Sequence, residues 1–475
     1  MRKIKGRVLC WDSDFIEREN NLQIVSHKPT TKNIALACDD IWEGVHNGYS
    51  SVLKIGDKYR LYYRASGGLC KSCICVAESF DGITFEKVDV GLYEAGGTKH
   101  NNIVYRRDNE IDNFAVFYDT NPNCPIAEKF KAIGAKRPAP GQREKLCYFA
   151  SEDGYSFTEM RYFDFSGTFD TYNVTFWDED TKQYYLYFRA FHRPNGDEIE
   201  DWNTTSLVSD IRDVRVATSP DFVNWTVHGR IKFAEGQSDM PLYTNQISRY
   251  YRARDSFIAF PVRYNERSSV KQNLSHMPIA DRRQYMTENF GREGTAFTDC
   301  LIMTSNDGFT FDRRDEAFLT PGPENRYNWW YGNCYMTYGM VETKADIQGQ
   351  SKEISMYVGE NYRLKSTNFR RMTIRLDGFF SWYGAYKGAE LLTKPFVFKG
   401  NTMKINFATS AAGGVDVAFC DEKGNALEGY SSYTMFGDST EREVEFDKPI
   451  SDLNEKTVRL KISLCDAHLY SFIFE

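Results

Sequence analysis

Acidic side chains stand directly before two strand-like runs of this 475-residue chain. Asp170 precedes the run 174–177, whose β-branched and aromatic residues are typical of a buried strand. Asp40 and Glu43 precede a second run at 49–53. Two carboxyl groups on one concave surface can cleave a glycosidic bond, because one protonates the leaving oxygen while the other acts as nucleophile or base. Glu43 and Asp170 are the predicted catalytic pair, with Asp40 as the alternative to Glu43.

A pattern that occurs five times indicates how these side chains are positioned. Each copy has two alternating apolar strands and then a turn with Asp, at Asp81, Asp153, Asp221, Asp307 and Asp377. An Asp-Gly pair between apolar runs, present in four of these turns, is a strong hairpin signal. The intervals between the turns fit one four-stranded blade each. The predicted fold is therefore all-β and begins with a five-bladed β-propeller.

The strand ahead of each copy would line the central channel of such a propeller. These innermost strands are predicted at 49–53, 103–105, 174–177, 247–250 and 335–338. An Asn stands at or before the start of each, namely Asn47, Asn102, Asn173, Asn245 and Asn333. Any one of them is explained by the preference for Asn where a turn enters a strand. Five in register predict a polar ring at the mouth of the channel.

Residues near these strand starts are predicted to share one funnel and to bind a substrate there. Amides, a histidine and aromatic rings suit a sugar, because the rings pack on it and the polar groups bond its hydroxyls. The arginines among them could orient a carboxylate or bind an anion, and ion pairs between blades explain them equally well. The predicted binding residues are Trp42, His46, Asn47, His100, Asn101, Asn102, Asn173, Arg189, Tyr243, Asn245, Gln246, Arg263, Trp330 and Asn333.

A structural role competes with catalysis for each acid. Asp40 or Glu43 could cap the turn that enters the first blade, and Asp170 could bond the backbone at the start of its strand. The position of Glu43 and Asp170 two blades apart favours catalysis, because it lets them face each other across a substrate.

The repeat stops after Trp382, and the remaining segments alternate with a period of two. They predict a C-terminal β-sandwich with a turn at Gly424-Asn425. The predicted domains are a propeller at 1–384 and a sandwich at 385–475. Two polar insertions, 193–209 and 266–294, are predicted to be functional loops over the propeller.

Composition limits the partners. A net charge of −7 without a basic block excludes nucleic acid and anionic membranes as main partners. No segment has the length and apolarity of a signal peptide or membrane span, so a cytoplasmic protein is expected. The 11 cysteines are expected to be reduced thiols, with Cys70, Cys73 and Cys75 in the core rather than on a soft metal. No metal or cofactor is predicted, and the chain could form a homo-oligomer.

The repeat, the run Ala217-Thr-Ser-Pro-Asp-Phe-Val-Asn-Trp225 and the C-terminal sandwich resemble the five-bladed furanosidase superfamily, which includes glycoside hydrolase families 32 and 43. Five further motifs more closely resemble an uncharacterised bacterial family 32-like group. They are Trp42-Glu43-Gly44, Phe169-Asp170-Thr-Tyr-Asn173, Leu242-Tyr-Thr-Asn-Gln246, Glu316-Ala-Phe-Leu-Thr-Pro-Gly322 and Asp466-Ala-His-Leu-Tyr-Ser-Phe472. The resemblance implies a nucleophile or base on the first blade, matched by Glu43 or Asp40, and an acid on the third, matched by Asp170.

Three signatures of family 32 differ in this chain. The sequences Asn-Asp-Pro-Asn and Glu-Cys are absent, and Arg212-Asp213 lacks the usual following proline. On the predicted second blade, His100-Asn101-Asn102 stands where a supporting carboxylate is expected.

The first functional hypothesis is an exo-acting glycosidase for a furanoside-containing oligosaccharide or glycoside. A glycoside phosphorylase is the second, motivated by Arg189, His192 and Arg263, because a phosphate could replace the attacking water. The third is a carbohydrate-binding module that does not cleave.

Overall fold

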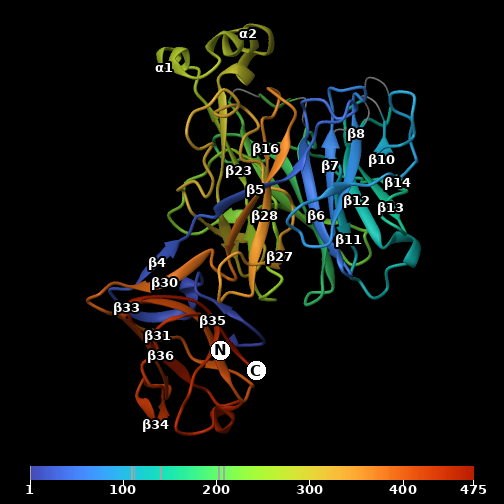
Figure 1. Ribbon diagram of the computed structural model, residues 1–475. Helices are drawn as coiled ribbons and strands as arrows, with labels where there is room; N and C mark the ends of the chain where they lie inside the picture. Colours follow the sequence, from blue (N-terminus) through green and yellow to red (C-terminus); the bar gives the residue numbers. More distant parts are fainter. Residues whose placement is uncertain (1, 108–110, 112, 140–141, 202–203, 207–208) are drawn as a thin grey trace.

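The computed structural model describes residues 2–107, 111, 113–139, 142–201, 204–206 and 209–475. It shows a propeller of upright sheets, with a smaller sandwich below it that contains both chain termini (Figure 1). The predicted fold class, a five-bladed β-propeller followed by a C-terminal β-sandwich, is confirmed.

Blade one contains a strand that the sequence had suggested for blade two. Its sheet runs β10-β8-β7-β6, with β9 also on β8. The strands are β6 (Gly48–Ile55), β7 (Lys58–Ala65), β8 (Cys73–Ser79), β9 (Glu86–Lys87) and β10 (Ile103–Arg106). The prediction that 103–105 lines the channel is wrong, because Ile103 pairs with Cys75 at the outer side of blade one.

Blade two therefore begins later in the chain. Its order is β11 (Ala115–Tyr118), β12 (Phe130–Lys136), β13 (Lys145–Ser151) and β14 (Thr158–Tyr162). Strand β11 lies beside β6 and β15, the inner strands of blades one and three. Asn113 thus has the place that was predicted for Asn102.

Blade three agrees with the prediction, and blade four is broken into two sheets. Blade three is β15 (Val174–Asp178), β16 (Gln183–His192), β17 (Ile211–Ser219) and β18 (Thr226–Arg230). In blade four, β20 (Leu242–Thr244), β23 (Val262–Glu266) and β24 (Ala296–Cys300) form one sheet. The other contains β19 (Lys232–Phe233), β26 (Thr310–Arg313), β25 (Met303–Ser305), β22 (Phe257–Ala259) and β21 (Ser248–Arg249). Gln246, with φ 41°, and Pro261, which lacks a backbone N–H, lie at the breaks.

Blade five is closed by a strand from the start of the chain. Its order is β27 (Val341–Lys344), β28 (Lys352–Glu360), β29 (Asn368–Arg375) and β5 (Thr30–Ala37). The expectation that 377–382 ends this blade is wrong, because β30 (Phe380–Gly384) pairs with β36 and β4 of the sandwich. The four other turn aspartates each accept backbone N–H bonds two and three residues ahead, for example from Ile83 to Asp81 at 2.7 Å.

The sandwich also includes the first strands of the chain. Its sheet contains β2 (Val8–Leu9), β3 (Ile16–Asn20), β4 (Gln23–Ser26), β30, β31 (Ala389–Thr393), β33 (Met403–Cys420), β34 (Ala426–Ser431), β35 (Asp438–Glu443) and β36 (Arg459–Phe474). A small parallel pair joins β1 (Arg2–Lys3) to β32 (Phe396–Val397). The sheet pairing therefore differs from the predicted limits 1–384 and 385–475, because β1 to β4 and β30 belong to the sandwich.

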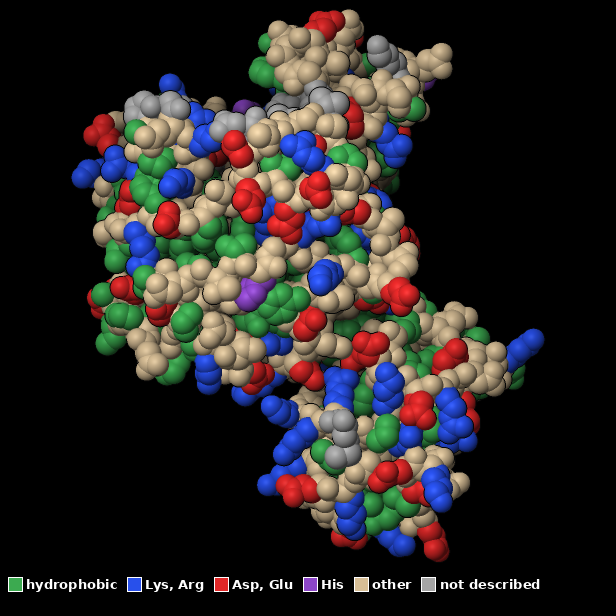
Figure 2. Space-filling view, turned by 180° about the vertical axis from the view of Figure 1, so that it is seen from behind, with side chains coloured by type: hydrophobic (Ala, Val, Ile, Leu, Met, Phe, Trp, Pro, Cys, Tyr) green, Lys and Arg blue, Asp and Glu red, His purple; other side chains and the backbone are tan. Residues whose placement is uncertain are grey.

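The insertion at 266–294 folds into helices above the propeller, α1 (Lys271–His276) and α2 (Ala280–Phe290), followed by a short 3-10 turn at Gly291–Gly294 (Figure 1). Other 3-10 turns are Ser13–Phe15, Ile126–Glu128 and Ile450–Leu453. No helix of the described residues has the length and apolarity of a membrane span. Figure 2 shows charged side chains of both signs spread over the sandwich, without a single-sign face in that view.

Candidate functional site

Five tyrosine rings meet at the centre of the propeller, near the starts of the inner strands. Successive rings in the order Tyr172, Tyr49, Tyr335, Tyr243 and Tyr264 are stacked, with centroids 5.8, 5.9, 5.9 and 5.8 Å apart. All five side chains are buried and come from blades three, one, five and four. We call them the tyrosine cluster. Further side chains pack against this cluster.

Three arginines pack on rings of the tyrosine cluster, and the cluster and these arginines together form one layer. The guanidinium carbon of Arg189 is 5.0 Å from the ring centre of Tyr243, and that of Arg212 is 4.5 Å from the ring centre of Tyr264. Arg64 lies 4.7 Å from the ring of Tyr49. Cation–π contacts of this kind are favourable and orient the guanidinium plane. Of the rings and arginines in this layer, the sequence had selected only Tyr243 and Arg189 as binding residues.

Asp170 is the acid that the structure places next to this layer. Its side chain is 47% exposed and forms an ion pair with Arg189, which is only 3% exposed. Arg189 is itself fixed, since its Nε donates to the Thr168 carbonyl oxygen at 3.1 Å and its backbone N–H donates to Asn173 Oδ1 at 3.0 Å. The carboxylate of Asp170 is thus half-exposed just before β15 and is paired with an arginine that the protein fixes in place.

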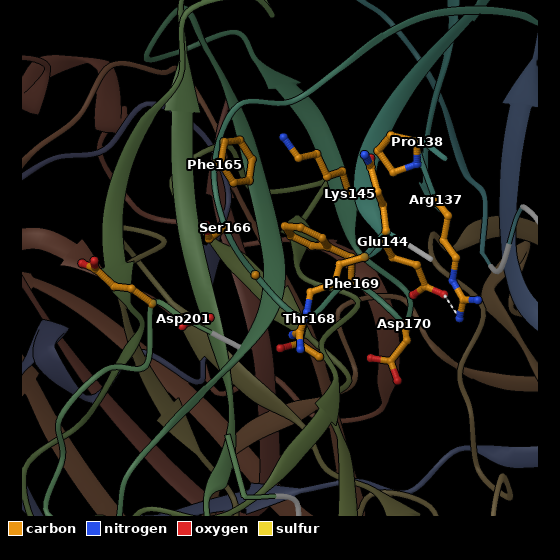
Figure 3. A pocket seen from close by; sticks show the side chains of 14 residues that line it. Arg137, Pro138, Glu144, Lys145, Phe165, Ser166, Thr168, Phe169, Asp170 and Asp201 are labelled. Atoms are coloured by element: carbon orange, nitrogen blue, oxygen red, sulfur yellow. Dashed lines mark ion pairs between the residues drawn. The ribbon is translucent and has the colours of Figure 1, made fainter. Parts of the chain in front are cut away.

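A pocket of about 930 Å³ opens at Asp170 (Figure 3). Glu144, Glu200 and Asp201 line it together with Asp170, and Phe165 and Phe169 supply apolar surface. Glu144 pairs with Arg137 at 3.6 Å, the contact drawn in Figure 3. This pocket therefore offers several carboxylates around one space large enough for a sugar.

Glu43 does not line that pocket. Its side chain has no exposed surface, and its oxygens accept hydrogen bonds from the Tyr63 hydroxyl, from the Asp40 backbone N–H at 2.8 Å and from Lys87 Nζ at 2.8 Å. Burial raises the pKa of Glu43 although Lys87 and Tyr63 oppose the shift. The geometry matches the turn-capping role that competed with catalysis.

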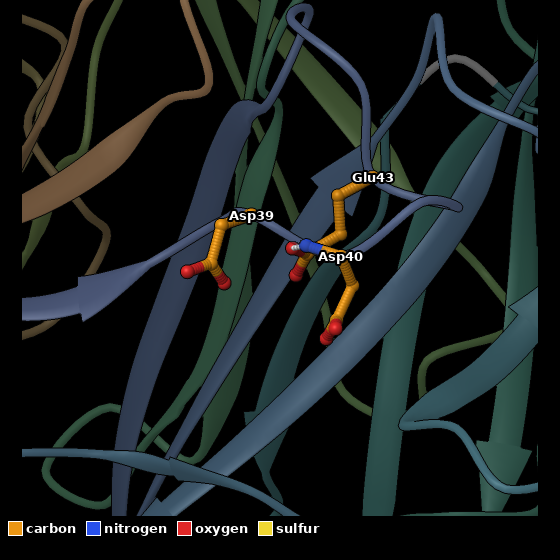
Figure 4. Close-up of side chains that lie close together, drawn as sticks. All are labelled: Asp39, Asp40 and Glu43. Atoms are coloured by element: carbon orange, nitrogen blue, oxygen red, sulfur yellow. Dashed lines mark hydrogen bonds between the residues drawn. The ribbon is translucent and has the colours of Figure 1, made fainter.

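Asp39 and Asp40 complete a cluster with Glu43 (Figure 4). Lys87 Nζ lies 2.9 Å from Asp39 and 2.8 Å from Asp40, so an ammonium group sits among the three carboxylates. The hydrogen bonds and charges of these acids raise the pKa of Lys87 against the effect of burial. The predicted alternative, Asp40, thus serves an ion-pair network of blade one.

Trp42 and Asn102 extend this network. Trp42 Nε1 donates to Asn102 Oδ1 at 3.0 Å, and Asn102 Nδ2 donates to the Tyr63 hydroxyl at 2.9 Å. His100 is 89% exposed and pairs with Asp89, while Asn101 Nδ2 donates to the Tyr93 carbonyl oxygen at 2.7 Å. Because β10 is an outer strand of blade one, paired with β8, His100, Asn101 and Asn102 do not precede an inner strand as predicted.

The inner-strand asparagines use their side chains on nearby backbone. Asn47 accepts from the Ser66 N–H at 3.2 Å, Asn245 from the Ile247 N–H at 3.2 Å and Asn333 from the Trp330 N–H at 2.6 Å. Asn173 donates to the carbonyl oxygens of Phe169 and Thr171. Asn113, which is not among the predicted residues, donates to the Phe169 carbonyl oxygen at 2.9 Å. Each of these side chains thus bonds backbone near the start of its strand, through partners that differ from blade to blade, and the predicted sugar contacts remain predictions.

The other predicted binding residues also have partners within the protein. His46 is half-buried, and its ring packs at a tilt against that of Tyr362, with ring centroids 5.9 Å apart. Burial, with Arg363, Arg64 and Arg282 nearby, lowers the pKa of His46 to about 4. Arg263 pairs with Asp299 across β23 and β24.

Gln246 and Trp330 are both buried. Gln246 accepts from the Thr244 hydroxyl at 2.8 Å. Trp330 lies beneath Arg283, whose guanidinium carbon is 4.9 Å from its ring centre. Both side chains therefore contribute to packing in this structure.

A histidine between two carboxylates lies beside the layer. His192 Nδ1 is 3.0 Å from Asp213 and its Nε2 is 2.6 Å from Asp239. Burial lowers the pKa of His192, but the hydrogen bonds to Asp213 and Asp239 raise it overall. Asp239 also pairs with Arg230 at 2.9 Å and lines a smaller pocket of about 480 Å³. This chain of ionic contacts ties blade three to the loop before β20.

No protein-family model and no curated protein matches the chain. Similar solved structures include a Bombyx mori GH32 β-fructofuranosidase, with a TM-score of 0.42 and 10% identity over 94% of each chain. A thermostable family-43 glycoside hydrolase has a TM-score of 0.41 and 12% identity over 73% of this chain and 96% of that one. An N-acetylgalactosamine deacetylase from F. plautii, solved with blood group B trisaccharide, has a TM-score of 0.46 and 11% identity over 73% of this chain and 94% of that one.

Solved members of families 32 and 43, the families that the motifs resemble, are thus among the structures similar to this chain. With TM-scores below 0.5, these similarities do not assign an activity to this chain, and the chemistry must be argued from its own residues.

Proposed function

We propose that this protein is a glycoside hydrolase that cleaves a glycosidic bond in the pocket at Asp170, acting from the end of a furanoside-containing substrate. The observation that carries the proposal is the half-exposed Asp170 carboxylate, fixed by buried Arg189 at a pocket of about 930 Å³. Glycosidic cleavage requires a positioned carboxyl group of this kind beside a space of sugar size, together with a second carboxyl group.

The second carboxylate is proposed to come from the same pocket. Glu144, Glu200 and Asp201 line it, whereas Glu43 does not. In this reaction one carboxylic acid gives its proton to the leaving oxygen, and the other carboxylate either attacks the sugar or removes a proton from the attacking water. The pair Glu43 and Asp170 is therefore replaced by Asp170 and one of these three acids.

The test is hydrolysis of a panel of aryl furanosides and aryl pyranosides, followed by measurement of the Asp170→Asn variant on the best substrate. We expect kcat/KM to fall by about 10²- to 10⁴-fold, the usual contribution of a positioned acid or base. Glu144→Gln, Glu200→Gln and Asp201→Asn identify the partner by a loss of similar size. Full activity in folded Asp170→Asn protein contradicts the proposal, and binding of sugars without turnover supports a binding module instead.

A glycoside phosphorylase is the second candidate, favoured by the guanidinium groups around the site. Arg189 and Arg212 both lie within 6.0 Å of the Tyr243 ring centre, and Arg189 reaches Asp170. Guanidinium forks suit phosphate oxygens. Turnover that requires added phosphate and releases a sugar 1-phosphate would establish this reaction, whereas turnover independent of phosphate supports hydrolysis.

A further inference from the structure

A second large pocket lies under the helical insertion. Its volume is about 1050 Å³, and it is bounded by the insertion on one side and by blades three and four on the other. Many of the residues that line it have polar side chains, among them Ser209, Ser268, Ser275, Asp281, Gln284, Thr287, Glu288 and Thr295. The walls thus offer many hydrogen-bonding groups to a ligand.

The wall formed by α2 is fixed to the propeller by a buried arginine. Arg283 is 2% exposed and donates to the carbonyl oxygens of Pro278, at 3.2 Å, and Trp329. Its guanidinium carbon lies 5.1 Å from the ring centre of Phe297 and 4.9 Å from that of Trp330. Gln284 and Glu288 stand on the pocket side of the same helix, 2.9 Å apart through one hydrogen bond. These groups are therefore presented by an anchored helix.

The second pocket adjoins the layer that holds Asp170. Arg212 and Tyr264 line the second pocket. Arg212 lies 5.3 Å from the ring centre of Phe191, and Arg189, the partner of Asp170, lies 5.4 Å from the same ring. Phe191 thus connects the lining of the second pocket to the arginine that pairs with Asp170.

We propose that the second pocket binds the further sugar residues of a neutral oligosaccharide whose scissile bond lies at Asp170; this rests on the proposed function. Sugar hydroxyls donate to carboxylate and amide oxygens, and Tyr264 offers an aromatic surface. Acids outnumber arginines in the lining, with Asp210, Glu266, Asp281 and Glu288 against Arg212 and Arg283. This balance disfavours an acidic or phosphorylated glycan and accepts a polyhydroxylated neutral one.

The test measures kcat/KM of the full-length protein and its variants on substrates of different length. The double variant Gln284→Ala, Glu288→Ala removes polar groups from the pocket wall, and Asn289→Ala on the same helix is the control because Asn289 does not line the pocket. We expect kcat/KM for tri- and tetrasaccharides to fall about tenfold in the double variant, equal to about 1.4 kcal/mol. The value for an aryl monoglycoside should be unchanged in both variants.

Equal losses on short and long substrates, or no loss on either, overturn the inference. If the wild-type protein hydrolyses none of the substrates, the proposed function fails and binding decides the inference separately. Titration calorimetry with a neutral tetrasaccharide should then show weaker binding to the double variant than to the wild type and Asn289→Ala. Equal binding to all three, or tighter binding of an oligouronate, overturns it.

Discussion

At the scale of single residues, the structure separates two acids that the sequence treats alike. Both Glu43 and Asp170 precede an inner strand, but Asp170 is 47% exposed and Glu43 has no exposed side-chain surface. The difference arises because Glu43 lies within reach of Tyr63 and Lys87, side chains from other strands of blade one. A sequence motif gives the order of residues before a strand and not the depth of each side chain.

Glu43→Gln tests this separation. We expect the variant to lose about 1–3 kcal/mol of unfolding free energy, because an amide replaces a carboxylate that accepts bonds from Tyr63, Lys87 and the Asp40 backbone. Its kcat/KM should equal that of the wild type. Urea unfolding and the best substrate of the panel provide the two measurements. Asp39→Asn is the matched control, since Asp39 is 72% exposed in the same cluster and should change the stability little.

His27 gives a prediction for the pH dependence of stability. Burial, with His468 and Arg375 nearby, lowers its pKa from 6.5 to about 4. As the pH falls, the unfolded chain therefore binds the proton at a higher pH than the folded protein does. The stabilisation of the folded protein by neutral His27 is complete above pH 6.5 and is lost as the pH falls toward 4. The melting temperature should decrease from pH 7.5 to pH 5. The melting temperature of the His27→Gln variant should decrease less over the same interval. An equal decrease in both proteins would contradict the assignment of this pH dependence to His27.

At the scale of elements, the blade turns explain why the repeat is visible in the sequence. Ser305 and Asp307 bond each other and the turn backbone, and Gly308 follows with φ 78°. A Cβ at Gly308 would lie 2.7 Å from Phe257 Cζ and from the Tyr187 hydroxyl oxygen. Only glycine therefore lets the turn pack against the blade.

Gly308→Ala should lower the unfolding free energy by about 2–4 kcal/mol, through backbone strain together with the clash. Gly56→Ala isolates the backbone effect, because Gly56 has φ 58° and a Cβ there would have nothing within 4 Å. We expect about 1 kcal/mol for that control. Urea unfolding of both variants gives the difference, and equal losses would show that the close contact is unimportant.

The elements that the sequence predicts are those with a local pattern of residues. The blade-three strands, the four capped turns and the sandwich were all predictable, because each has a local pattern of alternation or turn residues. The assignment of 103–105 to blade two failed because β10 and β11 are both short, apolar strands, and only pairing with β8 distinguishes them. The tyrosine cluster could not be predicted either, since its rings come from four blades and their stacking is a property of ring closure.

At the scale of the whole molecule, the chain closes the propeller and ties it to the sandwich with its own N-terminal segment. Strand β5 pairs with β29 to complete blade five, while β3 and β4 pair with β31 and β30 in the sandwich. The sequence hid this arrangement, because a long-range pairing between the first and last segments leaves no local signal. Asp377, which the repeat had suggested as a fifth turn residue, lies at the junction instead and is 1% exposed.

Asp377→Asn tests how strongly the two domains depend on this junction. Asp377 accepts from the Tyr250 hydroxyl at 2.7 Å and pairs with Arg252 at 2.8 Å, both on the propeller side. Its other oxygen accepts from Ser471 of β36 at 2.7 Å and lies 3.4 Å from Arg7. Since the variant leaves the buried Arg7 and the partly buried Arg252 against a neutral amide, we expect a loss of about 3–5 kcal/mol in unfolding free energy.

The pH dependence of this loss carries the sign of a carboxylate with a lowered pKa. Burial raises the pKa of Asp377, but Arg7 and Arg252 lower it overall, so its stabilisation is present at neutral pH and disappears as the pH falls through the acidic range. The wild type and Asp377→Asn should therefore approach each other in urea unfolding near pH 3 and differ most at pH 7. Asp346→Asn, in which an exposed acid loses its pair with Lys32, should stay within about 0.5 kcal/mol of the wild type at pH 7. A similarly small effect of Asp377→Asn at pH 7 would mean that other contacts, such as the hydrogen bond from Arg375 of β29 to Asn406 of β33 at 2.7 Å, hold the sandwich to the propeller.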